Sequence, residues 1–156
     1  MTREQTCCFT GHRPGKLPWG FDEADPRCLA LKGAIARELE GLYRRGFRHF
    51  LSGMAQGCDL YFAEGVLALR ASHPDVTLEG AVPFPGQADR WPEGERRRWR
   101  AILDACDVET VVQQHYDRFC MMRRNRYMVD RSARILAGPG AFWPSLTARR
   151  AELCTP

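Results

Sequence analysis

The chain has 156 residues, of which 44% are hydrophobic and 27% charged, and its formal net charge is +4. These values indicate one globular domain with a core that needs no disulfides, and the mild positive charge favours an anionic partner without demanding nucleic acid. Residues 1–6 contain no apolar signal and no apolar run is long enough for a bilayer, which excludes a membrane-spanning protein and predicts a cytoplasmic one with no membrane partner.

The seven cysteines show none of the paired C-x-x-C spacing that metal and redox sites favour. We interpret them as reduced and mostly buried, and we predict no metal site. Cys58 follows a glycine-containing loop, so it is the cysteine that we would test for reactivity.

Residues 6–10 read as a short buried strand, and the turn that leaves it carries Gly11, His12 and Arg13. An imidazole and a guanidinium therefore lie at the exit of the first strand, where ligands collect in an open parallel sheet. The alternative is a polar loop with a solvated Arg13.

Asp25-Pro26 predicts a helix start, since an acid caps the helix and proline suits its first position. Apolar residues recur at helical spacing until Gly46 ends the helix. They are Cys28, Ile35, Leu39 and Leu42. Residues 47–52 then form a second strand, in which we expect His49 to be a structural histidine with satisfied hydrogen bonds.

The stretch from Phe50 to Glu64 reads as a strand end, a tight loop and a helix N-terminus. Gly53 and Gly57 permit positive φ and the close approach of a ligand to the backbone, and the unpaired N–H groups of the helix suit an anion. A phosphate-bearing ligand fits these features. The alternative is that both glycines serve the strand-to-helix turn for steric reasons alone.

The helix after this loop carries two acids. Asp59 has a simple explanation, because the helix dipole favours an acid in the first turn. Glu64 instead falls at the margin of the apolar stripe of this helix, which makes it the more unusual carboxylate.

Residues 76–82 read as a third strand that ends at Pro83, and Gln87 and Trp91 follow its exit. An amide and a flat aromatic ring there could contact a ribose or a base. Residues 93–105 form a helix whose arginines at 96, 97, 98 and 100 are most simply a solvated face, and residues 107–113 form a fourth strand.

Residues 116–132 read as a helix with Asn125 on its apolar stripe, so we expect a buried amide that bonds a loop or faces a pocket. Residues 133–137 form a fifth strand. The alternation of strands and helices implies an α/β fold with a parallel sheet covered on both faces. The turns after the first three strands then meet at one edge.

Five ordered motifs within residues 6–137 together resemble the YpsA-like branch of the SLOG superfamily. They are Thr10 to Pro14, Ser52 to Asp59, Ala63-Glu64, Pro83-Phe84 with Gln87 and Trp91, and Arg124-Asn125 through Asp130. This superfamily includes the DNA-processing protein A domain, the LOG phosphoribohydrolases and molybdenum-cofactor carrier proteins, and the branch is largely uncharacterised. The resemblance implies a Rossmann-like three-layer α/β/α fold with a mostly parallel sheet of about five strands.

The resemblance also implies a pocket for a nucleotide or nucleotide-derived ligand of the ADP-ribose, NAD or AMP type. Asn125 and Asp130 would shape its wall, while the turns hold phosphate or ribose. The ligand-binding candidates on those turns are Thr10, Gly11, His12, Arg13, Ser52, Gly53, Met54, Ala55, Gly57, Pro83, Gln87 and Trp91.

The sequence departs from this pattern after residue 137, so we divide it into a SLOG domain at 1–137 and a divergent segment at 138–156. The Gly-Gly-Thr turn that the resemblance implies is absent, Pro139 lacks an N–H, Trp143 would crowd a phosphate, and Ser145 is the candidate cap of a short helix. We hypothesise a truncated or frame-altered C-terminus, and we expect the exposed edge strand to favour a homo-oligomer.

The favoured function is a cytoplasmic sensor or carrier of a nucleotide-derived molecule. The alternative is an enzyme that cleaves the N-glycosidic bond of a nucleoside monophosphate, with Glu64 or Asp59 aiding departure of the base. A third reading is nucleic-acid binding through the arginines at 96–100 and 123–126; it ranks last because the net charge is mild.

Overall fold

The computed structural model describes residues 1–138 and the strand at Thr147–Arg149. Its strands are β1 (Thr6–Thr10), β2 (His49–Ser52), β3 (Thr77–Val82), β4 (Val108–Val111), β5 (Arg134–Ala137) and β6 (Thr147–Arg149). Its α-helices are α1 (Pro26–Arg44), α2 (Cys58–Ser72), α3 (Glu93–Ala105) and α4 (Cys120–Asp130). Short 3-10 turns at Arg3–Gln5 and Pro14–Lys16 flank β1.

The strands form one sheet in the order β4-β3-β2-β1-β5-β6. β1 to β5 all run parallel to one another, and β6 is antiparallel to β5. Each parallel pair of consecutive strands is joined through a helix, as a parallel connection requires. The predicted Rossmann-like α/β fold with a mostly parallel sheet is confirmed.

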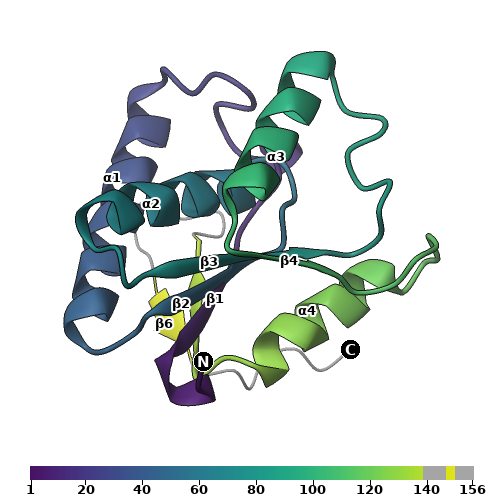
Figure 1. The fold of residues 1–156 in the computed structure, drawn as a ribbon. Helices are drawn as coiled ribbons and strands as arrows, with labels where there is room; N and C mark the ends of the chain where they lie inside the picture. The colour runs from purple at the N-terminus through teal and green to yellow at the C-terminus, as the bar shows by residue number, and fades with distance from the viewer. Residues whose placement is uncertain (139–146, 150–156) are drawn as a thin grey trace.

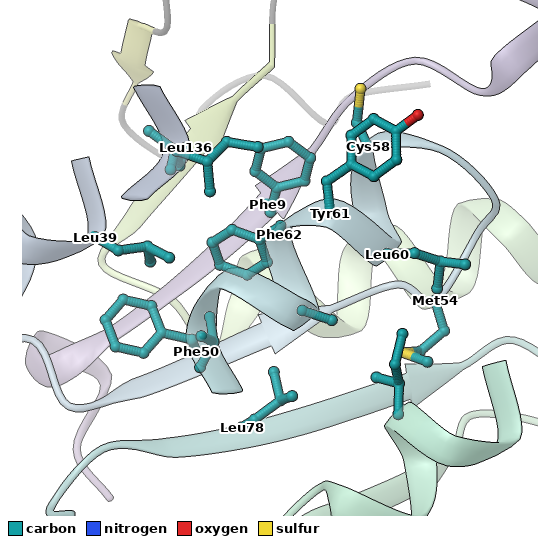
Figure 2. Close-up of a cluster of buried hydrophobic side chains, with 14 of the residues drawn as sticks. Phe9, Leu39, Phe50, Met54, Cys58, Leu60, Tyr61, Phe62, Leu78 and Leu136 are labelled. Carbon is teal, nitrogen blue, oxygen red and sulfur yellow. The ribbon is translucent and has the colours of Figure 1, made fainter. Parts of the chain in front are cut away.

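The helices cover both faces of the sheet unequally. α1, α2 and α3 lie on one face and α4 lies on the other (Figure 1). Because successive strand side chains point to opposite faces, Phe50 packs into the larger core under α1 to α3, whereas Leu51 packs in a smaller cluster with Met128 of α4. In the larger core, the Phe9 and Phe62 rings stack with centroids 4.7 Å apart (Figure 2).

The local signals of α1 are confirmed. The Asp25 carboxylate accepts a hydrogen bond from the Arg27 N–H at 2.8 Å, Pro26 occupies the first turn, and Gly46 takes a φ of 98° just after the helix. The buried stripe contains the four predicted residues and Leu31. This helix could be predicted from the sequence because it has start and stop signals at its two ends and a regular apolar stripe.

Two predicted helices differ from the structure. The predicted helix at 116–132 begins only at Cys120, because the Asp117 carboxylate accepts the Phe119 N–H at 2.8 Å and holds a turn there. A helix capped by Ser145 would include Thr147–Arg149, which instead form β6. The other predictions for residues 139–146 and 150–156, including those on Pro139 and Trp143, lie outside the described residues.

The expectations about membrane-spanning segments and cysteines can also be compared with the structure. In the part of the chain that is described, no helix is both long and apolar enough to cross a membrane. Of the six described cysteines, all but Cys106 are buried, in line with the expectation that most cysteines are buried.

Candidate functional site

Segments that follow the parallel strands converge on one hollow at the carboxyl edge of the sheet. The hollow has a volume of about 130 Å³. It is lined by Arg13 after β1, Ala55 and Gln56 after β2, Gln87 and Trp91 after β3, and Met121 in the first turn of α4. Ligands of open α/β sheets bind at this edge, so the hollow is the candidate site.

The glycine loop after β2 differs from its sequence interpretation. Gly57 has the expected positive φ, 84°, but Gly53 does not; Met54 takes φ 60° instead. Gly53 is required by close packing, because a Cβ there would lie 2.6 Å from Nη1 of Arg124. A strained non-glycine residue such as Met54 persists only where surrounding contacts hold it.

Those contacts come from two side chains that donate to the same carbonyl oxygen. The Arg124 Nη1 and the Gln87 Nε2 both hydrogen-bond the oxygen of Gly53, the latter at 3.1 Å. The Gln87 Oε1 accepts from the Trp99 Nε1 at 3.1 Å, so both ends of this amide are engaged. Gln87 thus supports the loop while lining the hollow.

Asp59 fixes the other end of the loop from inside. Its carboxylate, only 6% exposed, accepts the Ala55 N–H at 3.2 Å. Burial raises the pKa of Asp59 to about 6, against the opposing effect of the Arg124 and Arg13 cations. The fully buried Ser52 hydroxyl donates to the Asp59 carbonyl at 2.9 Å and accepts the Met54 N–H.

The backbone donors of the loop are therefore already used in part. The Ala55 N–H bonds Asp59, and the Cys58 N–H bonds the His12 carbonyl oxygen at 3.2 Å. From the sequence, we predicted that such N–H groups bind a phosphate. In the structure, two side chains that line the hollow carry donors with no partner among the described residues.

Gln56 and Arg13 are those side chains. The Gln56 Nε2 is buried, yet it has no hydrogen-bond partner among the residues that the structure describes. The Arg13 side chain is exposed and makes no ion pair with any other described residue. Sequence reasoning omitted Gln56 from the site; its one signal was a long polar side chain between Ala55 and Gly57 of the loop.

Four further predicted site residues lie at the same edge without lining the hollow. Thr10 ends β1 and its carbonyl accepts the Gly138 N–H at 2.7 Å. Gly11 is needed for packing, since a Cβ there would lie 2.6 Å from the Cβ of Cys58. His12 contributes its carbonyl to the start of α2, and Pro83 is buried after β3.

The structure separates two other predicted residues, Glu64 and Asp130, from the hollow. Glu64 is exposed and ion-paired with Arg98 at 2.5 Å, and Arg98 also pairs with Glu23, so Arg98 is not the solvated residue that we predicted. Asp130 lines a second hollow, which contains residues from the first positions of β1 and β2.

Asn125 corrects the predicted register of α4. It is only half-buried and accepts a hydrogen bond from the Arg124 Nε at 2.8 Å. The buried polar residue is Arg124, 5% exposed, whereas Met122 of the predicted stripe is 45% exposed. The buried polar side chain of α4 that bonds a loop is therefore Arg124 and not the predicted Asn125.

The expected reactivity of Cys58 is contradicted by its surroundings. The side chain is fully buried, and burial, with a contribution from Asp59, raises the pKa of the thiol to about 12. A thiol with that pKa is protonated at neutral pH and is a poor nucleophile.

Comparison with known proteins identifies the family of this chain. Residues 7–137 match the model of the YspA SLOG family, and the chain belongs to that family. It is 31% identical over 108 residues to the UPF0398 protein BH1768 of Halalkalibacterium halodurans. The matched residues cover 68% of this chain and 57% of the relative. It is 33% identical over 114 residues to the UPF0398 protein SSP1297 of Staphylococcus saprophyticus, covering 72% and 60%.

A third relative, the UPF0398 protein RBAM_020340 of Bacillus velezensis, is 26% identical over 129 residues, covering 81% of this chain and 70% of the relative. The chain thus spans about three fifths of the length of the first two relatives. The resemblance that the sequence motifs indicated is confirmed at the level of the family.

Proposed function

We propose that this YspA SLOG family protein binds a nucleotide-derived ligand, as a sensor or carrier, and holds its phosphate or ribose in the hollow at the carboxyl edge. The single observation that carries the proposal is the buried Nε2 of Gln56, which has no partner among the described residues and whose side chain lines the same hollow as Arg13. A buried donor without a partner is costly, and an acceptor-rich anion would satisfy it.

The size of the hollow limits which part of the ligand enters it. Sites for whole drug-sized ligands measure roughly 300–1,000 Å³, whereas this hollow measures about 130 Å³. A phosphate with part of a ribose matches the smaller volume. The half-buried ring of Trp91, held edge-to-face against Trp99 with centroids 6.4 Å apart, would contact the sugar or the base at the rim.

Calorimetric titration of the whole chain with AMP, ADP-ribose and NAD tests this proposal, followed by chromatography of each ligand. We expect one of them to bind intact. Gln56→Ala and Arg13→Gln should each weaken binding by about tenfold or more, since each removes a donor to a charged group. Gln114→Ala alters an exposed glutamine and serves as the matched control. Absence of binding by all three ligands would overturn the proposal.

A second candidate function is hydrolysis of an N-glycosidic bond, and the observation that favours it is Asp59. A buried carboxyl with a pKa of about 6 is suited to proton transfer near neutral pH. Release of free base during the titration, abolished by Asp59→Asn and retained by Glu64→Ala, would establish this reaction in place of simple binding. Glu64 ranks behind Asp59 because Arg98 already holds it.

A further inference from the structure

A second hollow lies on the α4 face of the sheet, near the amino ends of β1 and β2. Its volume is about 350 Å³, within the range of small-molecule sites. The residues that give it chemical character are Arg3, His49, Glu79, Tyr127, Asp130 and Arg131. α4 lies below the sheet in Figure 1, and Tyr127, Asp130 and Arg131 belong to its last turn and the residue that follows it. The proposed nucleotide site does not involve this hollow.

The floor of this hollow is a buried network centred on Glu79. The Glu79 Oε1 contacts the His49 Nε2 at 2.8 Å, and its Oε2 accepts from the Tyr127 hydroxyl at 2.5 Å and from the Thr110 hydroxyl at 2.9 Å. The Nδ1 of His49 contacts the Thr77 hydroxyl at 2.7 Å, so the prediction of a satisfied His49 is confirmed. Both Glu79 and His49 are only 6% exposed.

Glu79 brings a negative charge to this floor. Burial acts to raise the pKa of Glu79, but hydrogen bonds from His49, Tyr127 and Thr110 outweigh it and hold the pKa below its ordinary value. Two carboxylate oxygens offer about four acceptor positions, of which three are occupied. The floor therefore retains acceptor capacity for a donor.

The rim carries charges of both signs. Arg131 is anchored with its guanidinium carbon 3.8 Å from the centroid of the Tyr127 ring and its Nη1 3.3 Å from the Tyr127 carbonyl oxygen. Arg3 adds a second guanidinium and Asp130 a second carboxylate. A phosphate dianion is disfavoured here, because it would lie near two carboxylates. The described residues contain no group of three His, Cys, Asp or Glu side chains that could hold a metal ion.

From this distribution we propose that the second hollow binds a small zwitterion of the amino-acid class, with its ammonium group at Glu79 and Tyr127 and its carboxylate at Arg3 and Arg131. An ammonium group supplies three donors to the acceptors at the floor. A carboxylate matches the fork of a guanidinium at the rim. The inference goes beyond the nucleotide site and stands independently of it.

The test is an amide correlation spectrum of the ¹⁵N-labelled full chain, titrated with each of the common amino acids. Binding should perturb the signals of His49, Glu79 and Asp130 while leaving those of Ala55 and Gln56 unchanged. Two modified probes separate the charges: an N-acetyl amino acid lacks the ammonium group, and an amino-acid amide lacks the carboxylate. Each should bind about tenfold or more weakly than its parent, because each loses one charge-assisted contact.

Glu79→Gln, which removes the charge that faces the ammonium group, should weaken amino-acid binding. Two rim variants keep the proposal testable if Glu79→Gln fails to fold. Arg131→Gln and Asp130→Asn alter exposed side chains, and Arg131→Gln should weaken amino-acid binding, whereas Arg126→Gln, another exposed arginine of α4, should not. The titration with AMP should be unaffected by any of them. If no amino acid perturbs the hollow, or if the modified probes bind as well as their parents, the proposal is overturned.

Discussion

The guanidinium of Arg124 donates a hydrogen bond to the carbonyl oxygen of Gly53, two residues that lie 71 positions apart in the sequence. This contact joins the helix on one face of the sheet to the loop that follows β2. It explains both why residue 53 is a glycine and how Met54 is held at φ 60°. The candidate site depends on it, because Ala55 and Gln56 extend from the same loop.

Gly53→Ala tests this packing. An added Cβ would lie 2.6 Å from the Arg124 Nη1 and 2.7 Å from its Cζ, so the buried guanidinium must move. Overpacking of this kind lowers the free energy of unfolding by about 1–3 kcal/mol. Chemical denaturation measures the change, with Gly41→Ala as the control, since a Cβ at that helical position would meet no packing neighbour within 4 Å among the described residues. A Gly53→Ala variant as stable as the native chain would show that Arg124 yields freely.

Arg124→Met removes the guanidinium but keeps an apolar side chain in the same buried space. The Gly53 oxygen then loses one of its two side-chain donors, and the buried Asp59 carboxylate loses a favourable cation. We expect a loss of about 3 kcal/mol, the scale for removing one partner of a buried charged group. Arg126→Met, at an exposed position of the same helix, should change stability by no more than about 0.5 kcal/mol.

The sequence predicted the fold better than it predicted the contacts of the site. α1 could be placed because Asp25, Pro26 and Gly46 mark its ends by local chemistry. In α4, the apolar stripe was read one residue away from the real one, because the long stem of an arginine can be buried like a methionine. Periodicity assigns such a residue to the surface, so Arg124 was missed.

The glycine loop shows a different limit. Its position at the carboxyl edge followed from the order of strands and helices. The partners of its N–H groups did not, because the His12 carbonyl and the Asp59 carboxylate take them through tertiary contacts. No local pattern indicates that these donors are used or that the Gln56 amide is left without a partner.

Cys58 should resist thiol reagents in the folded protein. Its side chain is inaccessible, and burial raises its pKa to about 12, so the thiolate is scarce at neutral pH. Iodoacetamide labelling followed by peptide mass spectrometry should find Cys58 modified only after denaturation. The unfolded chain is the internal control, and rapid labelling in the native state would contradict the fully buried position.

Asp59→Asn should change how stability depends on pH, because burial raises the pKa of Asp59 from 3.8 to about 6. In this range the folded state binds the proton more tightly than the unfolded state does. The contribution of Asp59 to stability is therefore fully present below pH 3.8 and is lost as the pH rises through about 6. A difference of about two pKa units corresponds to about 3 kcal/mol.

The quantity to measure is the free energy of unfolding of the native chain minus that of Asp59→Asn, followed by denaturant titration across this pH range. The subtraction removes the opposite slope that carboxylates with lowered pKa values, such as Glu79 and Asp107, contribute to both proteins. We expect the difference to fall as the pH rises. Asp89→Asn, at an exposed aspartate, is the matched control. A difference that is constant or rises with pH would mean that folding does not raise the pKa of Asp59. The argument for Asp59 as a proton donor near neutral pH would then fail.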